Sequence, residues 1–329
     1  MKEHEIRPSK LLYRYLELSV QDADECFSDC RKSTIPCVGC AGTDLAFQFE
    51  KNGFPYSLCK KCGTLFQSPR PPFEAFEAFY RNSESSRYWA ESFFPAVAEA
   101  RREKIFKPRV MRLSNLCNTK DISVKKIIDV GAGYGIFLDE WRKFDPDVIA
   151  VAIEPSQLLA EECRNKKFEV IEDIVENVQD YDGFADLVVC FEVLEHVYEP
   201  LTFLLTLKKL VRPGGYLFIS TLCADGFDIQ VLWEKSNSVS PPHHINFLSK
   251  NGFKILFTRA GMNKLDFSTP GLLDVDIVRN SMKQAPELRK QHRFLNELVN
   301  DEKHGQVFQE FLVENQLSSH VWIISRKTN

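Results

Sequence analysis

Short apolar runs alternate with amphipathic stretches from about Ser123 onward. The runs KKIIDV, DVIAVAI, FEVI, ADLVVCF and GYLFIST are predicted strands, and IFLDEWRKF, QLLAEECRNK and LTFLLTLKKL between them have helical spacing. This alternation predicts an α/β fold with a parallel, doubly wound sheet. ADLVVCF is apolar at nearly every position, which is typical of a central strand covered on both faces.

The pattern on either side of this alternation predicts three regions. Residues 1–70 hold a short helical lead-in, LLYRYLELSV, and a cysteine module over 33–70 that closes on the proline-rich SPRPPF. Residues 71–122 are charged and aromatic with helix-like spacing, and we expect linking helices there. Residues 123–329 form the main domain, which continues with a helix near 250–260, a strand near 265–268, two charged helices across 281–316 and a last strand, HVWIIS.

Composition narrows the class of protein. A length of 329 residues suggests about two average domains, and 44% hydrophobic with 27% charged residues is ordinary for a soluble globular protein. A net charge of −4 argues against a broadly basic binder of nucleic acid or anionic membranes. We find neither an apolar run of about 20 residues that could span a bilayer nor a secretory signal in MKEHEIRPSK. We therefore expect a cytoplasmic protein without membrane or nucleic-acid partners, whose ten cysteines are thiols or metal ligands.

Four cysteines form two C-x-x-C pairs with eighteen residues between them. This spacing matches a zinc site, and each pair is followed by a glycine that suits the turns around sulfur. Four thiolates make a closed, structural tetrahedral site with no position for a reactive water. The open alternatives are a contribution from Cys26 and Cys30 or a module without its metal. The expected zinc ligands are Cys37, Cys40, Cys59 and Cys62.

The charge of this cysteine module bears on its partner. Residues 33–70 hold four Lys or Arg and two acids, and four thiolates with one Zn²⁺ bring the formal charge from +2 to zero. A neutral module gains little affinity from counterion release. We therefore expect a lid or docking element on the substrate side rather than a nucleic-acid binder.

The segment IIDVGAGYG, residues 127–135, ends a predicted strand and opens a predicted helix. Gly131 and Gly133 allow a sharp turn and a close approach of ligand to backbone. The third glycine, Gly135, comes one position earlier than in the nicotinamide pattern. Glu154 ends the next strand twenty-three residues after Gly131, where a carboxylate can accept both hydroxyls of a ribose. The pattern suits a ligand with an amino acid, a sulfonium and an adenosine; the alternative is a glycine loop that only packs helix on strand.

From Ser123 to Thr221 this arrangement resembles the class I S-adenosylmethionine-dependent methyltransferases, with their Rossmann-like seven-stranded sheet. The resemblance implies that the glycine loop wraps the methionine part, that Glu154 holds the ribose and that Pro155 lies against the adenine. Asp173 is the expected contact to the adenine edge, with Glu172 as the alternative. Phe191 and Glu192 would line the methionine side. The loop residues concerned are Asp129, Gly131, Ala132, Gly133 and Tyr134.

The run CFEVLEHV places Glu192, Glu195 and His196 just past the fourth strand of the sheet, at the edge where ligands bind in open α/β sheets. If a helical turn begins there, Glu192 and Glu195 share one face and could hold a metal or poise a base. The string E-x-x-E-H resembles the quinone-pathway O-methyltransferases and implies a divalent-metal site near the substrate. The alternative is that His196 caps the turn and orients a donor contact.

The segment SPPHHINFLS, residues 240–249, holds His243 and His244 between the fifth strand and the next helix. Methyl transfer to a hydroxyl or an acidic carbon needs a base, and histidine titrates near working pH. A similar stretch occurs in zinc-ribbon relatives of the methyltransferases, which implies that at least one histidine contacts substrate. Glu195 and His196 are the other candidate catalytic residues. The alternative is that a histidine only hydrogen-bonds backbone to close the loop.

The whole chain resembles methyltransferases of polysaccharide and deoxysugar pathways, whose acceptors are often nucleotide-linked sugars. We therefore expect a small-molecule methyltransferase, with O-, N- and C-methylation open. One alternative is a zinc-ribbon rRNA methyltransferase, which would need a basic ribbon face. Another is a non-enzymatic assembly factor, against which the intact glycine loop and Glu154 argue. The pattern leaves the acceptor and the oligomeric state undetermined.

Overall fold

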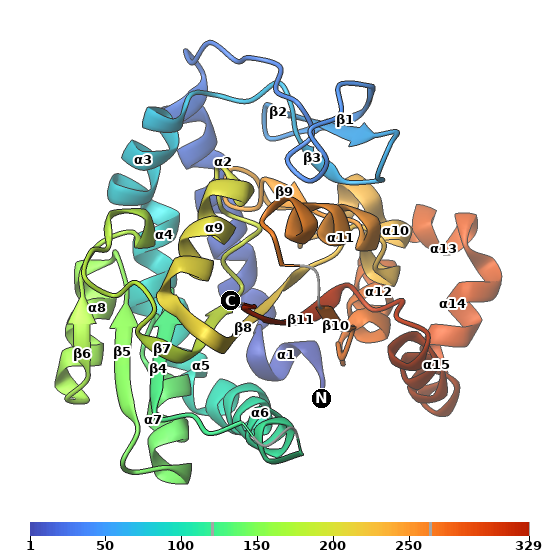
Figure 1. Cartoon of the computed structure of the whole chain (residues 1–329). Coiled ribbons are helices and arrows are strands. Elements are labelled where there is room, and N and C mark those ends of the chain that lie inside the picture. Colours follow the sequence, from blue (N-terminus) through green and yellow to red (C-terminus); the bar gives the residue numbers. More distant parts are fainter. Residues whose placement is uncertain (120–121, 263–264, 329) are drawn as a thin grey trace. The chain divides into compact units, whose positions relative to one another are not determined.

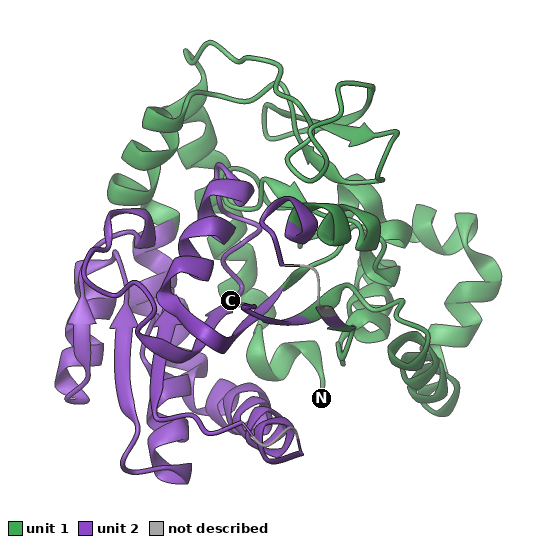
Figure 2. Cartoon of the chain, in the orientation of Figure 1, with its two compact units in different colours: residues 1–85, 221–256, 267–322 green, residues 86–220, 257–266, 323–329 purple. Residues whose placement is uncertain are grey.

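The computed structural model of the chain describes residues 1–119, 122–262 and 265–328 (Figure 1). These residues divide into two compact units, which Figure 2 colours separately. Unit 1 comprises residues 1–85, 221–256 and 267–322, and unit 2 comprises residues 86–220, 257–266 and 323–329.

Unit 2 contains the predicted strand–helix alternation. The helix expected from IFLDEWRKF is α7, Ile136–Phe144, and the other predicted strands and helices of this segment are also present. The strands are β4 (Lys126–Val130), β5 (Ile149–Ile153), β6 (Glu169–Ile171), β7 (Ala185–Phe191) and β8 (Val211–Leu222), and the further helices are α8 (Gln157–Asn165), the 3₁₀ turn η3 (Val175–Asn177) and α9 (Pro200–Leu210).

The seven strands of this sheet follow the order β10-β11-β8-β7-β4-β5-β6, with β10 at Leu265–Ser268 and β11 at His320–Arg326. From β6 to β8 all neighbours are parallel. Strand β11 runs antiparallel to β8. The backbone hydrogen bonds of Lys327 with Gly214 and Gly215, next to the two strands, have the antiparallel pattern. The predicted seven-stranded α/β sheet is therefore confirmed, but it is a mixed sheet, not the wholly parallel one that the strand–helix alternation predicted. The strand order reverses between β4 and β7, and open α/β sheets bind ligands at such a switch point.

Strand β7 is the centre of the hydrophobic core of unit 2. All seven of its residues, ADLVVCF, are buried, as the apolar run predicted. Its neighbour β4 is buried from Ile127 to Val130. This doubly covered core holds the carboxyl ends of β4 and β7 rigidly beside each other.

Helices precede this sheet, as the sequence predicted for the region before Ser123. They form a nearly continuous run in which two π-helical turns interrupt the α-helical pattern. The segments are α4 (Glu84–Tyr88), η1 (Trp89–Phe93), α5 (Phe94–Arg101), η2 (Arg102–Phe106) and α6 (Lys107–Thr119).

Unit 1 is built around a second, antiparallel sheet of order β1-β2-β3-β9. The cysteine module supplies three strands, β1 (Leu45–Lys51), β2 (Phe54–Cys59) and β3 (Leu65–Gln67). The fourth strand, β9 (Asn246–Phe247), belongs to the segment 240–249 that holds the two histidines. The pairs Leu65–Phe247 and Phe66–Asn246 join them. Sequence periodicity did not predict this pairing, because the two-residue strand β9 is too short to show a pattern.

Helices make up most of the rest of unit 1, and one expectation about them was wrong. The lead-in helix is present as α2, which runs over nineteen residues because a buried face continues through Asp22 and Ala23 to Phe27. The expected pair of helices across 281–316 is a set of four, because Pro286 begins a new helix and Asp301 caps another. The helices are α1 (Glu3–Ile6), α2 (Ser9–Phe27), α3 (Phe73–Asn82), α10 (Phe227–Leu232), the 3₁₀ turn η4 (Trp233–Lys235), α11 (Lys250–Arg259), α12 (Asp274–Gln284), α13 (Pro286–Gln291), α14 (Arg293–Asn300) and α15 (Glu302–Glu314).

Within the described residues, the helices are too short or too polar for any of them to cross a bilayer.

Candidate active site

The glycine loop connects the end of β4 to the start of α7 in unit 2. Gly131 and Gly133 have φ angles of +73° and +55°, a left-handed conformation that favours glycine. A Cβ on Gly131 would lie 2.6 Å from a methyl carbon of Val193, whereas a Cβ on Gly133 would have no atom within 4 Å. The N–H groups of Gly131 and Ala132 donate to the carbonyl of Ile153, which ties the loop to β5. The loop therefore has one packed side and one side open to a ligand.

Glu154 follows β5 directly and contacts this loop. Its Oε2 accepts a hydrogen bond of 2.8 Å from the N–H of Gly133, and its Oε1 accepts one of 3.0 Å from Ser156. Burial raises the pKa of Glu154, and these two hydrogen bonds oppose the shift. The next residue, Pro155, is exposed. The geometry places a buried carboxylate and an exposed ring beside the open side of the glycine loop.

Asp129 and Arg109 place an acidic and a basic side chain in the interior near the ends of β4 and β7. Asp129 is 1% exposed, and its Oδ1 has no hydrogen-bond partner within the described part of the chain. Burial raises the pKa of Asp129 to about 8, although Arg109 lowers it in part. A buried carboxylate oxygen without a partner is costly, so this atom is suited to a donor group of a ligand.

Arg109 was missed by sequence reasoning. It lies on α6, where buried residues recur at helical spacing, and its guanidinium is 4.3 Å from the centre of the Phe191 ring. Its Nη2 donates to Glu192 Oε1 over 3.2 Å, while its buried Nε has no partner among the described residues. The sequence did contain a signal for Arg109, because an arginine on the buried face of an amphipathic helix is unusual. The helix lies before the strand–helix motifs of the sheet, where no functional residue was expected.

Glu192 has a left-handed backbone with φ of +54°, unusual for a residue other than glycine. Its Oε1 also accepts a 2.6 Å hydrogen bond from the hydroxyl of Ser220, at the end of β8. Non-glycine residues in this conformation often cluster at functional sites, where the surrounding structure holds the strain. Phe191 before it is buried against Phe137 and Phe218.

The helical turn that would place Glu192 and Glu195 on one face does not begin at Glu192. Residues 193–196 form a turn in which the N–H of His196 donates to the carbonyl of Val193, and α9 begins only at Pro200. Because its own backbone is left-handed, Glu192 lies outside the right-handed turn that holds Glu195. Glu195 is 1% exposed and His196 is half-buried in this turn.

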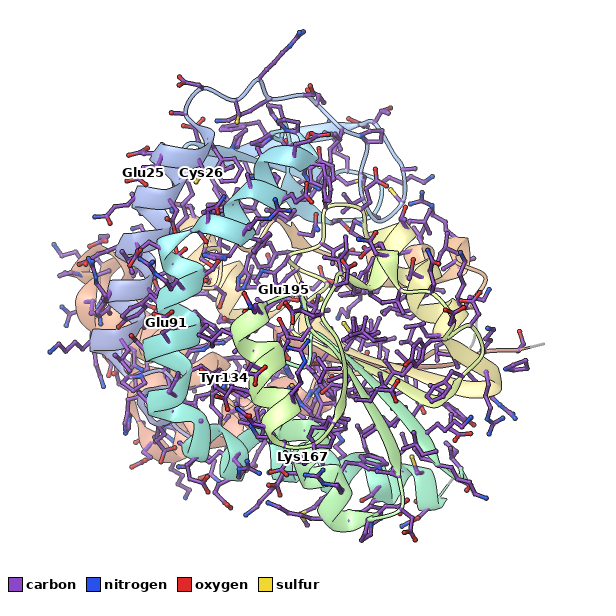
Figure 3. The ribbon with its side chains drawn as sticks, turned by 90° about the vertical axis from the view of Figure 1, so that its left-hand side faces the viewer. Glu25, Cys26, Glu91, Tyr134, Lys167 and Glu195 are labelled. Atoms are coloured by element: carbon purple, nitrogen blue, oxygen red, sulfur yellow. The ribbon has the colours of Figure 1, made fainter. Side chains whose placement is uncertain are left out.

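Tyr134 joins the glycine loop to the preceding helices. Its ring stacks on Phe94 with a centroid distance of 4.6 Å and an angle of 6° between the planes. Its hydroxyl donates to the carbonyl of Ala90, and Figure 3 shows Tyr134 beside the helical segment that carries Glu91. The residues of η1 and α5 therefore pack against the loop.

The two candidates for the adenine edge differ in their surroundings at the end of β6. Asp173 is exposed, and its Oδ1 accepts from the N–H of Ile174 at 2.7 Å and from the side-chain amide of Asn177 at 2.9 Å. Glu172 forms an ion pair of 2.6 Å with Arg164. Asp173 thus stabilises the turn that follows β6, whereas Glu172 pairs with Arg164 on α8.

The four cysteines of the two C-x-x-C pairs come together in unit 1. Their sulfur atoms all lie within 4.8 Å of one another, and all four residues are buried. Two Sγ–Sγ distances, Cys37–Cys62 and Cys40–Cys59, are 3.5 Å. A tetrahedral Zn²⁺ with Zn–S bonds of about 2.3 Å requires sulfur separations of about 3.8 Å, so the cluster fits the ion. Cys26 and Cys30 are not in this cluster, and the thiol of Cys30 contacts the carbonyl of Cys26 instead.

His243 and His244 lie in a turn of unit 1, residues 240–244, which we call the histidine turn. Side chains of the cysteine module form hydrogen bonds to the backbone of this turn. The hydroxyl of Tyr56 donates to the carbonyl of His244 over 2.5 Å, and the side-chain amide of Asn52 donates to that of Pro241 over 3.1 Å. From α3, the hydroxyl of Tyr80 donates to the carbonyl of His243 over 3.2 Å. The β1–β2 hairpin therefore positions the histidines as well as the cysteines.

The two histidine rings differ in burial. His243 is 4% exposed, and burial, together with the neighbouring His244, lowers the pKa of its ring to about 3. His244 is half-buried, with Nδ1 2.6 Å from the carbonyl oxygen of Ser238. Because a carbonyl only accepts, Nδ1 of His244 carries a proton, and the neutral ring has its lone pair on Nε2. Of the two, His244 is the stronger candidate for a base.

Comparisons with known proteins identify the family to which the sequence is similar. A family model described as "Methyltransferase domain" matches residues 97–266. The ubiquinone biosynthesis O-methyltransferase of Aliivibrio fischeri (strain ATCC 700601 / ES114) is 36% identical over 110 residues, covering 32% of this chain and 47% of that protein. Its counterpart from Vibrio parahaemolyticus is 35% identical over 103 residues, covering 30% and 44%. The chain thus spans about half the length of the curated relatives it matches.

Among solved structures, the plantazolicin methyltransferase BamL, in complex with a triazolic desmethylPZN analog and SAH, resembles this chain with a TM-score of 0.52. The sequences are 13% identical, and the match covers 77% of this chain and 94% of that one. At this identity the likeness concerns the fold.

Proposed function

The chain belongs to the methyltransferase domain family, and on this premise we propose that it is an S-adenosylmethionine-dependent methyltransferase acting on a small molecule. The observation that carries the proposal is the open side of the glycine loop at Gly133, directly beside the buried carboxylate of Glu154. The bound donor would supply an activated methyl group on sulfur.

Each end of such a donor has matching residues in unit 2. The Glu154 carboxylate would accept the ribose hydroxyls, the exposed Pro155 would lie against the adenine, and Asp173 would meet the adenine edge. Asp129 would accept from the ammonium of the amino acid with its unpartnered Oδ1, and Arg109 would bind the carboxylate. Ala132, Gly133 and Tyr134 would surround the methionine part, and Phe191 and Glu192 would close that side.

The acceptor class follows from chemistry and from the relatives. We propose methylation of a hydroxyl, because the curated relatives are named O-methyltransferases and because His244 offers a basic Nε2 to remove the proton. A nucleotide-linked or other sugar is the proposed acceptor, which rests on the resemblance of the whole chain to polysaccharide-pathway methyltransferases. Glu195 and His196, which lie in the turn after β7, are proposed to assist on the donor side.

We also propose a structural zinc ion in the four-cysteine cluster. The burial of all four thiols and their tetrahedral separations support it. Zinc there would hold the β1–β2 hairpin and, through β3 and β9, the histidine turn. In this proposal the cysteine module serves the acceptor chemistry rather than nucleic-acid binding.

A labelled-donor assay tests the proposed activity. The purified chain is incubated with S-adenosylmethionine carrying a radioactive methyl group and a panel of nucleotide-sugars, free sugars and phenols. Transfer of label to a nucleotide-sugar hydroxyl supports the full proposal, and transfer to a phenol corrects the acceptor. A chain that binds no donor by calorimetry contradicts the activity itself.

Glu154→Ala should weaken donor binding by roughly 1.5–3 kcal/mol, because two charge-assisted hydrogen bonds to the ribose are lost. Isothermal titration calorimetry with S-adenosylmethionine measures the change. Glu161→Ala, which removes an exposed carboxylate from the neighbouring helix α8, is the matched control and should bind as the wild type does. An unchanged dissociation constant in Glu154→Ala would remove this residue from the donor site.

A further inference from the structure

A chain of buried hydrogen bonds links Asp22, Ser85 and His243 within unit 1. The three residues are 3%, 0% and 4% exposed, although they come from α2, α4 and the histidine turn. The Ser85 hydroxyl contacts Asp22 Oδ2 on one side and lies 2.8 Å from Nε2 of His243 on the other. None of the sequence motifs includes Asp22 or Ser85.

The direction of each hydrogen bond follows from the donors present. Oδ1 of Asp22 accepts from the N–H of Glu84 at 3.0 Å, and Oδ2 accepts from the N–H of Ser85 at 2.8 Å. Backbone N–H groups only donate, so both carboxylate oxygens act as acceptors. The single hydroxyl hydrogen of Ser85 therefore points to Asp22, and its oxygen accepts from His243. It follows that His243 carries its proton on Nε2.

The remaining contacts hold the His243 ring and backbone in place. The ring centroid lies 5.1 Å from that of Tyr15 and 4.9 Å from that of Phe79. The N–H groups of His243 and His244 both donate to the carbonyl of Ser240, at 3.1 and 3.2 Å. The two histidines therefore share one turn, and Ser85 contacts that turn through the ring of His243.

The two neighbouring rings consequently have opposite tautomers. His243 is protonated on Nε2 by its contact with Ser85, and His244 is protonated on Nδ1 by its contact with Ser238. The nitrogen that carries the proton thus differs between the two rings, because one ring contacts a hydroxyl and the other a carbonyl.

We propose that Asp22 and Ser85 are positioning residues, which hold His243 as an anchor so that His244 keeps its proton on Nδ1 and its lone pair on Nε2. This inference rests on the proposed function of His244 as the base. Asp22 and Ser85 act through His243 and are not expected to touch substrate. Asp22 also caps the first turn of α4, so the test must separate positioning from helix capping.

Nuclear magnetic resonance of the full chain with ¹⁵N-labelled histidine tests the inference directly. Long-range ¹H–¹⁵N correlations assign the tautomer of each ring. We expect the Nε2–H form for His243 and the Nδ1–H form for His244 in the wild type. Finding His243 as the Nδ1–H form would overturn the inference, whatever the enzyme activity is.

Ser85→Ala separates the two roles of this cluster, because it removes the hydroxyl but keeps the N–H that Asp22 caps. We expect the ¹⁵N resonances of the His244 ring to shift towards those of a mixture of tautomers. We expect kcat with the identified acceptor to fall about tenfold. The dissociation constant of the donor should stay the same. Unchanged ¹⁵N resonances of the His244 ring in a folded Ser85→Ala protein would show that Asp22 and Ser85 only stabilise the fold, and would contradict the inference.

Asp22→Asn is the second variant, since it keeps the size of the side chain but turns one acceptor into a donor. It should shift the ring nitrogen resonances of His243, because the amide keeps only one acceptor oxygen for the three donors of Glu84 and Ser85 and so loosens the contact of Ser85 with His243. Asp24→Asn, which neutralises an exposed carboxylate on the same helix, is the matched control and should leave both rings unchanged. Unchanged ring nitrogen resonances of His243 in Asp22→Asn would contradict the inference. Failure of the proposed function would show separately, as absent donor binding.

Discussion

Replacing Cys37 and Cys40 by serine should remove zinc and unfold the four-stranded sheet of unit 1. The sulfur cluster is the centre of a small apolar core, in which Phe66 is the other fully buried side chain and Ile35 and Leu45 pack from outside. Structural zinc sites contribute about 10–16 kcal/mol of apparent binding free energy at pH 7, more than so small a core can replace. The wild type should contain one zinc per chain by atomic absorption, and the variant should contain none.

The effect of zinc loss should extend to the histidine turn. Strand β3 pairs with β9, and Tyr56 on β2 holds the carbonyl of His244. The variant should therefore lose the dispersed histidine resonances of the turn together with methyl transfer. Cys26→Ser/Cys30→Ser is the matched control outside the cluster and should retain zinc. A folded wild-type chain that contains no zinc would contradict the proposed metal site.

His244→Ala should lower turnover by about 10²–10⁴-fold, the usual contribution of a positioned general base. Donor affinity should stay near wild type, because the residues proposed to bind the donor all lie in unit 2. Single-turnover kinetics with labelled S-adenosylmethionine measure the first quantity, and calorimetry measures the second.

A matched control for this substitution is His304→Ala, which truncates an exposed histidine on α15 and should leave turnover unchanged. Normal turnover in His244→Ala would move the role of base to His243 or Glu195. Of these, His243 is poorly suited, because burial lowers its pKa to about 3 and its Nε2 is directed to Ser85.

Features that depend on neighbours in sequence were predictable. The helix Ile136–Phe144, the buried strand Ala185–Phe191 and the open glycine loop follow from periodicity and from local steric demands. Glu154 was placed beside the loop because it ends the strand next to β4. The conformation of Glu192 was not predictable, because a left-handed residue between a strand and a turn leaves no periodic trace.

Residues that act across long separations emerged only from the folded chain. Arg109 meets Glu192 from a helix eighty-three positions earlier, and Ser85 meets His243 across 158 positions. Spacing carries no information about such pairs, since no local period links them.

Local patterns were sufficient for the α/β sheet, the glycine loop and the four-cysteine set, because backbone geometry and metal coordination act over a few residues or a repeated spacing. Packing alone brought β9 against β3 and gave the neighbouring histidines opposite protonation. The reason is physical: a ring's tautomer depends on which acceptor lies within hydrogen-bonding distance, and only the three-dimensional fold supplies that acceptor.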